Sequence, residues 1–125
     1  MFDRHNAERA SNGLGLLQID AALVGIARSR ANDMAANNYF AHTSPTGVTA
    51  FTLLSQAGYS YSMAGENIAR NNYPGSQTVA TAMSGFMNSP GHRANILDGR
   101  YTRVGIGAVT GAAGMYYFAV VFAAK

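Results

Sequence analysis

The sequence lacks cysteine and tryptophan, and only one of its 125 residues is a lysine. Without cysteine there can be no disulfide, no zinc ribbon and no thiol nucleophile. Charged residues make up 12% of the chain and hydrophobic residues 48%, a balance that excludes intrinsic disorder. A chain of this length can bury enough apolar surface for a core of its own. We therefore expect a single domain over residues 1–125.

Acidic residues and histidines are also scarce. The glutamates are Glu8 and Glu66, and the histidines are His5, His42 and His92. Any chemistry that combines carboxylate and imidazole must draw largely on these few side chains. The basic residues are scattered and the net charge is only +3, so the charge pattern is not that of a nucleic-acid-binding surface. We expect no nucleic-acid partner.

Long apolar runs are missing as well. No segment approaches the roughly 18 residues that a membrane span needs, so no transmembrane segment is expected. The stretch from Met1 to His5 is polar and has no signal-peptide core. Two interpretations stay open on this ground alone: a cytosolic protein, or a domain of an exported protein whose signal lies outside this sequence.

The first two thirds of the chain has mainly helical patterning. Asp3 is placed to begin a helix that ends near Gly13, and Asp20 is placed to cap a helix over residues 21–37. The second helix carries a stripe at three- and four-residue spacing, which consists of Leu23, Ile26, Ala27, Arg30, Ala31 and Met34. Shorter helices are predicted over 51–57, from Ser76, and from Ser89 with Pro90 in its first turn.

The last part of the chain changes to the pattern of strands. Residues 104–109 alternate in character, and residues 115–123 form a nearly continuous aromatic and β-branched run, with a hairpin connection over 111–114 between them. A long apolar strand has both faces covered, so we expect the second one at the centre of the sheet. Helices followed by antiparallel strands indicate an α+β fold with layers.

Two histidines and one glutamate lie where chemistry is plausible. His42 precedes a Ser-Pro turn, Glu66 follows a glycine, and His92 lies in the first turn after Ser89. Two imidazoles and a carboxylate are a reasonable zinc set, but separations of 24 and 26 residues along the chain are no local metal signature.

Structural roles stay open for the same three residues. A cation such as His42 is favourable at the end of a helix, and His92 would be kept neutral by the start of one. Glu66 could accept backbone hydrogen bonds in a loop. His5 and Glu8 fall on the first predicted helix, and we expect both to be solvated.

Three segments resemble the bacterial branch of the CAP superfamily, the SCP-domain family that includes the cysteine-rich secretory proteins. They read ARSRANDMAANNYFAHTSPTG, AGYSYSMAGENIA and FMNSPGHRANIL, and YTRVGIGAV follows them. The segments occur in the order typical of the family, and GENIA together with SPGHRANIL is highly specific. The resemblance implies a three-layer α-β-α sandwich with a small central antiparallel sheet, which agrees with the α+β pattern.

The resemblance also implies a site. It places the two family histidines at His42 and His92 and the family glutamate at Glu66, in a cleft that binds divalent metal, often zinc, in several members. His42 and His92 are then expected as metal ligands, with Glu66 either as a third ligand or as an outer residue that orients one of them. Glu66 is also the expected catalytic residue if the protein is an enzyme. Ser89 stands where many eukaryotic members carry a further glutamate, three residues after a position that is Phe86 here, so the chain departs from the full four-residue set.

We expect a secreted or cell-envelope protein, monomeric, whose cleft holds a divalent metal such as zinc. Its role is expected to be that of a non-enzymatic binding module for an extracellular ligand: a peptide, a lipid or a cell-envelope component. One alternative is a zinc-assisted hydrolase with Glu66 as general base. Another is a binder of lipid or a small apolar ligand, which would use the Met and Phe side chains. Family resemblance alone assigns no reaction.

Overall fold

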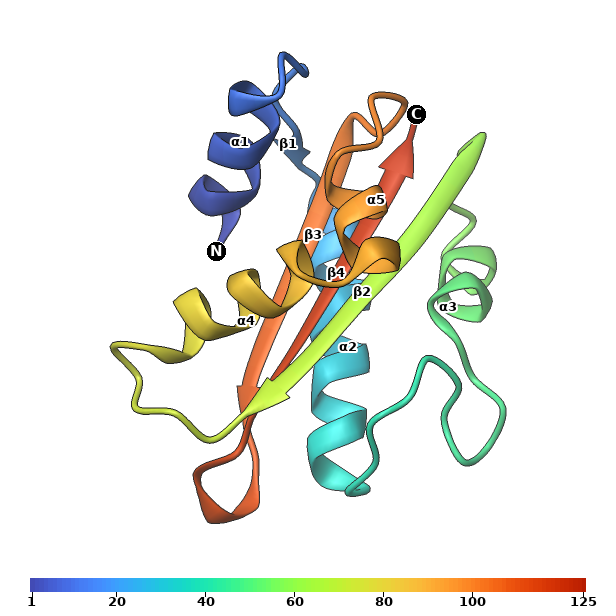
Figure 1. The fold of residues 1–125 in the computed structure, drawn as a ribbon. Helices are drawn as coiled ribbons and strands as arrows, with labels where there is room; N and C mark the ends of the chain where they lie inside the picture. The colour runs from blue at the N-terminus through green and yellow to red at the C-terminus, as the bar shows by residue number, and fades with distance from the viewer.

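The computed structural model describes residues 1–125, and in it helices cover both faces of a four-stranded sheet (Figure 1). The strands are β1 (Gln18–Ile19), β2 (Met63–Asn71), β3 (Arg103–Thr110) and β4 (Tyr116–Ala124). The helices are α1 (Phe2–Ser11), α2 (Ala21–Ala36), α3 (Ala50–Gln56), α4 (Thr78–Met87) and α5 (Pro90–Ile96). With α2 and α3 behind the sheet and α4 and α5 in front of it, the α+β three-layer sandwich is confirmed.

Strand β4 is central, as its long apolar run predicted. The sheet order is β1-β3-β4-β2, and β4 pairs antiparallel with both of its neighbours. Successive side chains of a strand point to opposite faces, so Val121 enters the core on the α2 side while Val120 and Phe122 enter the core on the α4 side. The antiparallel sheet carries one parallel addition that the sequence pattern did not predict, the two-residue β1 beside β3.

Helix α2 is fixed at its start and along its length. The Asp20 carboxylate accepts hydrogen bonds from the amides of Ala22 and Leu23, at 2.9 and 3.3 Å, so the predicted N-cap is confirmed. The helix then packs closely on β3, because Gly105 has no side chain: a Cβ there would lie 2.0 Å from the backbone carbonyl carbon of Leu23. This close approach holds α2, and the residues it carries, against the sheet.

The opposite face is filled by larger side chains. Phe86 of α4 and the ring pair Tyr101–Phe122, whose centroids lie 5.4 Å apart, are each at most 2% exposed. His5 and Arg9 of α1 are buried among them. The expectation that His5 is solvated is therefore wrong: His5 and Arg9 lie one turn apart and form the inward face of α1, where polar side chains give no apolar stripe to detect.

Two further expectations need correction. The segment around Glu66 is not a loop but the nine-residue strand β2, so the order of helices first and strands last is wrong. The helix expected from Ser76 begins two residues later, at Thr78. The hairpin over 111–114 is confirmed, with a turn of 3-10 helix at Ala112–Gly114. None of the helices combines the length and apolar character that crossing a membrane requires.

Candidate functional site

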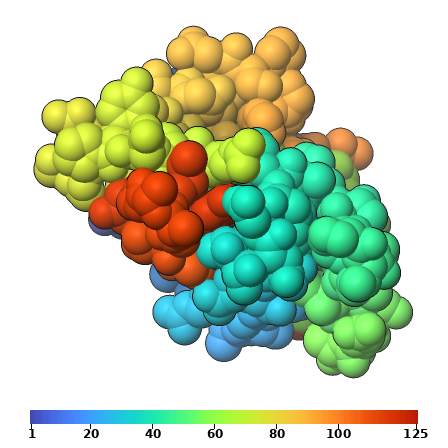
Figure 2. All heavy atoms as spheres, turned by 90° about the horizontal axis from the view of Figure 1, so that it is seen from below, coloured from blue at the N-terminus to red at the C-terminus, as the bar shows by residue number.

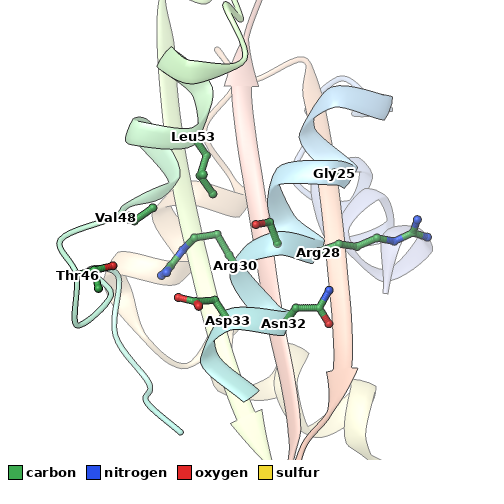
Figure 3. A pocket seen from close by; sticks show the side chains of 9 residues that line it. Gly25, Arg28, Arg30, Asn32, Asp33, Thr46, Val48 and Leu53 are labelled. Carbon is green, nitrogen blue, oxygen red and sulfur yellow. The ribbon is translucent and has the colours of Figure 1, made fainter. Parts of the chain in front are cut away.

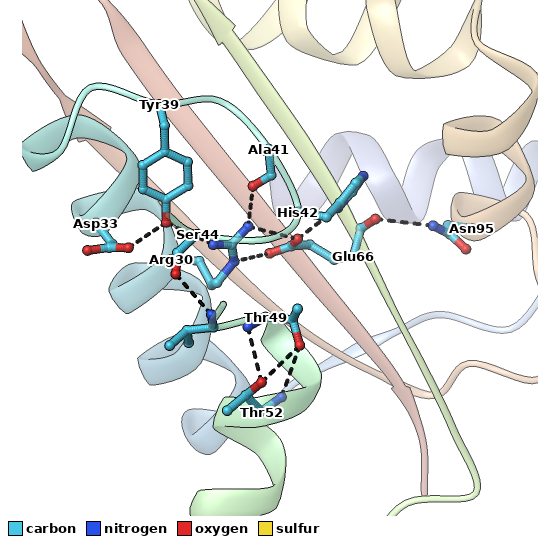
Figure 4. Close-up of polar contacts among 11 residues, drawn as sticks. Arg30, Asp33, Tyr39, Ala41, His42, Ser44, Thr49, Thr52, Glu66 and Asn95 are labelled. Carbon is cyan, nitrogen blue, oxygen red and sulfur yellow. Dashed lines mark hydrogen bonds and ion pairs between the residues drawn. The ribbon is translucent and has the colours of Figure 1, made fainter. Parts of the chain in front are cut away.

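Glu66 lies in the middle of β2, and its carboxylate is held by a buried arginine. The side chain is 3% exposed and points toward α2, where Arg30 meets it with two nitrogens (Figure 4). Nε of Arg30 donates to Oε2 at 2.8 Å and Nη2 donates to Oε1 at 3.2 Å. A two-pronged pair of this kind fixes both the position and the plane of the carboxylate.

His42 approaches the same carboxylate from the segment after α2. Its Nδ1 lies 2.9 Å from Oε1 of Glu66, while 57% of its side chain is exposed. The carboxylate can only accept hydrogen bonds, so in a neutral His42 ring Nδ1 carries the hydrogen and Nε2 is left with a free lone pair. Figure 4 shows the ring directed away from Glu66 beyond this contact.

Two backbone anchors hold this segment in place on either side of His42. The carbonyl of Ala41 accepts a hydrogen bond from Nη2 of Arg30 at 2.6 Å. Beyond the histidine, the Ser44 hydroxyl accepts from the amide of Val48 at 2.9 Å and closes a turn around Gly47, whose φ is +86°. The Ser-Pro-Thr-Gly sequence thus forms a defined turn, and His42 is placed by it.

His92 reaches the site from α5, on the other face of β2. Its backbone carbonyl accepts from the Asn67 amide at 3.0 Å, and Asn67 in turn accepts from Asn95 at 2.9 Å, so two amides fasten α5 to the strand. The His92 ring packs on Phe86 with centroids 5.3 Å apart. Burial, and then the charge of nearby His42, lower the pKa of His92, which favours the neutral imidazole that metals bind.

A cleft of about 420 Å³ opens beside His92, between β2, α4 and the segment after α2. Phe40 and Arg70 stand at its wall, with the guanidinium carbon 4.9 Å from the ring centroid. Seen from below, the segment after α2 lies against the end of β2, with α4 and α5 beyond it (Figure 2). Ser89 also lines this cleft, so a hydroxyl stands where the resemblance places a further glutamate.

The larger concavity of the molecule is elsewhere. A cavity of about 730 Å³, which we call the outer cavity, lies between the outer side of α2 and residues 46–53 (Figure 3). Its walls are mostly polar and include Arg28, Arg30 and Asp33, but neither His42 nor His92. The cavity and the histidines are therefore separate features, although Arg30 lines the cavity and also contacts Glu66.

The residues fit a metal only in part. His42 offers a free Nε2 and His92 a partly exposed, neutral-favoured ring, which suits two imidazole ligands. Both Glu66 oxygens already accept from Arg30 or His42, and no group of three or more His, Asp or Glu is arranged to hold a metal ion. Glu66 thus fits a residue that orients a ligand, as outer partners of metal-bound histidines do.

Three residues of this network lie within the first motif segment but were not expected as site residues: Arg30, Tyr39 and Asp33. Nη1 of Arg30 donates to the Tyr39 hydroxyl at 3.0 Å, and that hydroxyl donates to Oδ2 of Asp33 at 2.5 Å. A signal was present in one case, because Arg30 interrupts the apolar stripe of its helix. An arginine at a core position must find a buried partner.

Comparison with known proteins agrees with this architecture. The family profile for CAP, described as the cysteine-rich secretory protein family, matches residues 2–122. The uncharacterized protein YkwD of Bacillus subtilis is 45% identical over 104 residues, which cover 83% of this chain and 39% of that protein. The uncharacterized membrane protein YlbC of the same organism is 35% identical over 107 residues, or 86% of this chain and 30% of that protein. The chain thus spans well under half of either relative.

Solved structures show the same fold. An extracellular SCP-domain protein of Bacillus anthracis superposes with a TM-score of 0.87 at 33% identity, covering 99% of this chain and 39% of that one. An outer surface protein of Borrelia burgdorferi gives 0.88 at 19% identity, covering 99% and 89%. The motifs, the sandwich and the profile match lead to one conclusion: this chain, which has no cysteine, belongs to the cysteine-rich secretory protein (CAP) family.

Proposed function

We propose that this chain is a metal-dependent binding module of an extracellular or cell-envelope protein. In this proposal His42 and His92 ligate a divalent ion, zinc before others, and Glu66 orients His42 without touching the metal. The observation that carries the proposal is the 2.9 Å contact between Nδ1 of His42 and Glu66, which leaves Nε2 free. The extracellular and surface descriptions of the two solved relatives support the location.

The metal would supply one thing, a Lewis-acidic position with sites left open for a ligand oxygen beside its two imidazoles. The chain itself provides the rest of the recognition. Among the residues that line the cleft, Arg70 is the only one with a full charge, and none is acidic. Phe40 and Tyr73 add exposed aromatic surface. A ligand with an acidic group and an apolar portion complements this lining best.

The contacts of Glu66 favour binding over hydrolysis. A general base must reach the proton it removes, but this side chain is 3% exposed and both of its oxygens are engaged. The hydrolase alternative would require Glu66 to leave Arg30 and His42. Turnover of a peptide library that Glu66→Gln abolished would revive that alternative.

Calorimetric titration with zinc tests the proposal. We expect the wild-type chain to bind one ion, each of His42→Ala and His92→Ala to bind at least about tenfold more weakly, and the double variant to give no heat. The remaining histidine, His5, is fully buried and does not compete in the folded protein. Equal heats from the wild type and the double variant would overturn the metal site.

A further inference from the structure

We propose that Asp33, Tyr39 and Arg30 form a positioning relay that, through Glu66, fixes which nitrogen of His42 carries the hydrogen. The relay is a property of the metal-free chain. Its consequence for zinc affinity rests on the function proposed above. None of the three relay residues is placed as a metal ligand. They act on the His42 ring through Glu66, and Arg30 also anchors the backbone beside His42 at the Ala41 carbonyl.

The outer end of the relay has only one arrangement of hydrogens. Asp33 accepts from Nδ2 of Asn37 at 2.7 Å and from the hydroxyl of Tyr39. Because that hydroxyl gives its one hydrogen to Asp33, its oxygen is free to accept from Arg30. Burial, and then the bond to Asp33, raise the pKa of Tyr39 to about 12, so the hydroxyl keeps its hydrogen at neutral pH.

Arg30 links Tyr39 to Glu66 and holds the Glu66 carboxylate in one orientation. The guanidinium is 1% exposed and donates in four directions: to Tyr39, to the carbonyl of Ala41, and twice to Glu66. The group is planar and rigid, so anchoring one edge on Tyr39 and Ala41 sets the direction of the edge that faces Glu66. A lysine would keep the charge but could not reproduce this geometry.

At the other end of the relay, Glu66 contacts the partly exposed ring of His42. Both oxygens of Glu66 accept from Arg30, and Oε1 is the oxygen that faces Nδ1 of His42. The neutral ring is then held as the Nδ1–H tautomer, with the Nε2 lone pair directed outward. Figure 4 shows the five side chains in sequence, from Asp33 through Tyr39, Arg30 and Glu66 to His42.

Nitrogen NMR of the metal-free protein tests the relay directly. Long-range proton–nitrogen correlation of histidine-labelled protein at about pH 8, where an ordinary imidazole is neutral, reports the tautomer of each ring. We expect His42 to be the Nδ1–H form in the wild type. Arg30→Lys should move it strongly toward a mixture, and Tyr39→Phe should do so more weakly.

Tyr59→Phe is the matched control. Tyr59 also donates its hydroxyl hydrogen to a carboxylate, that of Asp20 at 2.7 Å. Asp20 lies at the start of α2 and makes no hydrogen bond to Arg30, Glu66 or His42. This variant should leave the His42 signals unchanged. Zinc titration of the same proteins should show affinity reduced about 10- to 100-fold in Arg30→Lys, less in Tyr39→Phe and not at all in Tyr59→Phe.

A wild-type tautomer in Arg30→Lys would overturn the relay, and circular dichroism of that variant confirms that it is folded. A Tyr39→Phe spectrum that matches Tyr59→Phe would overturn its outer half. If the wild type shows no zinc heat while Arg30→Lys still shifts the tautomer, the metal proposal fails and the relay is supported.

Discussion

Each face of the sheet buries one arginine, Arg9 on α1 and Arg30 on α2, and both are 1% exposed. Arg9 has only neutral partners: it donates to the backbone carbonyls of Gly15, Ile96, Asp98 and Tyr101. Burial lowers the pKa of Arg9. Burial acts in the same direction on Arg30, but Glu66 and Tyr39 together outweigh it and raise the pKa of Arg30. Arg9 thus ties backbone segments together, while Arg30 orients a side chain at the site.

The two faces of the sheet also differ in how they are packed. On the α2 face small residues let the helix backbone approach β3, whereas on the α4 face aromatic rings fill the space. Helix α2 therefore has little room to shift relative to β3. The same helix carries Arg30, which places His42 through Glu66 and Ala41. The position of Arg30 relative to Glu66 therefore depends on the close packing of α2 against Gly105, as well as on the polar contacts of the site.

The largest expected effect comes from adding one methyl group to the α2 face. Gly105→Ala would bring a Cβ to 2.0 Å from the Leu23 backbone, so α2 must move. We expect the free energy of unfolding, measured in urea, to fall by about 3 kcal/mol, the upper end for overpacking. Gly25→Ala on the outer side of α2 has open space and should be neutral or slightly stabilising. Equal losses in both variants would contradict the close-packing account.

The second-largest expected effect is a loss of folding stability in acid, and it comes from His5 on the α4 face. Burial, the largest cause, lowers the pKa of His5 to about 4 from an ordinary 6.5, and its Nε2 has no hydrogen-bond partner. As pH falls, the unfolded chain therefore binds this proton first. Stability from His5 is complete above about pH 6.5 and is lost progressively toward pH 4, by about 3 kcal/mol in all.

Urea unfolding across this pH range measures the effect, with His5→Gln as the control. The variant removes the titrating ring, so its free energy of unfolding should fall less steeply between pH 6.5 and pH 4 than that of the wild type. Parallel curves for the two proteins would show that His5 contributes nothing to the acid response.

The smallest predicted effect is that of Arg9→Met, which distinguishes the role of Arg9 from that of Arg30. Arg9→Met leaves four backbone carbonyls without this donor, two of them only partly buried. Because the variant also removes a buried charge, which offsets part of this cost, we expect a net loss of about 2 kcal/mol in the free energy of unfolding. Zinc affinity of the folded protein should stay within about twofold of the wild-type value, in contrast to Arg30→Lys. A loss of zinc affinity in Arg9→Met as large as in Arg30→Lys would remove the distinction between the two faces.

Local patterns predicted the fold well where each element is stabilised by its own residues. The Asp20 cap and the periodic stripe predicted α2, and the apolar run predicted β4 and its central place. Strand β2 escaped because Glu66 and Asn67 break its alternation. Both are buried polar residues whose partners, Arg30 and Asn95, lie far away in the sequence.

The site divides in the same way. Motif resemblance pointed to His42, Glu66 and His92 as candidate site residues, but it could not show that both Glu66 oxygens are occupied by hydrogen bonds with Arg30 and His42. These hydrogen bonds join residues that are far apart in the sequence: His42 and Glu66 are 24 positions apart, and Arg30 and Glu66 are 36 positions apart. Tyr39 and Asp33 have ordinary local settings, so nothing in the sequence distinguishes them from surface polar residues.

The most direct measurement is anomalous diffraction at the zinc edge from crystals of this chain soaked in zinc. We predict one peak bonded to Nε2 of His42 and to the His92 ring, with Glu66 still paired to Arg30 and to Nδ1 of His42. A peak bonded to the Glu66 carboxylate, or the absence of a peak at both histidines, would contradict it.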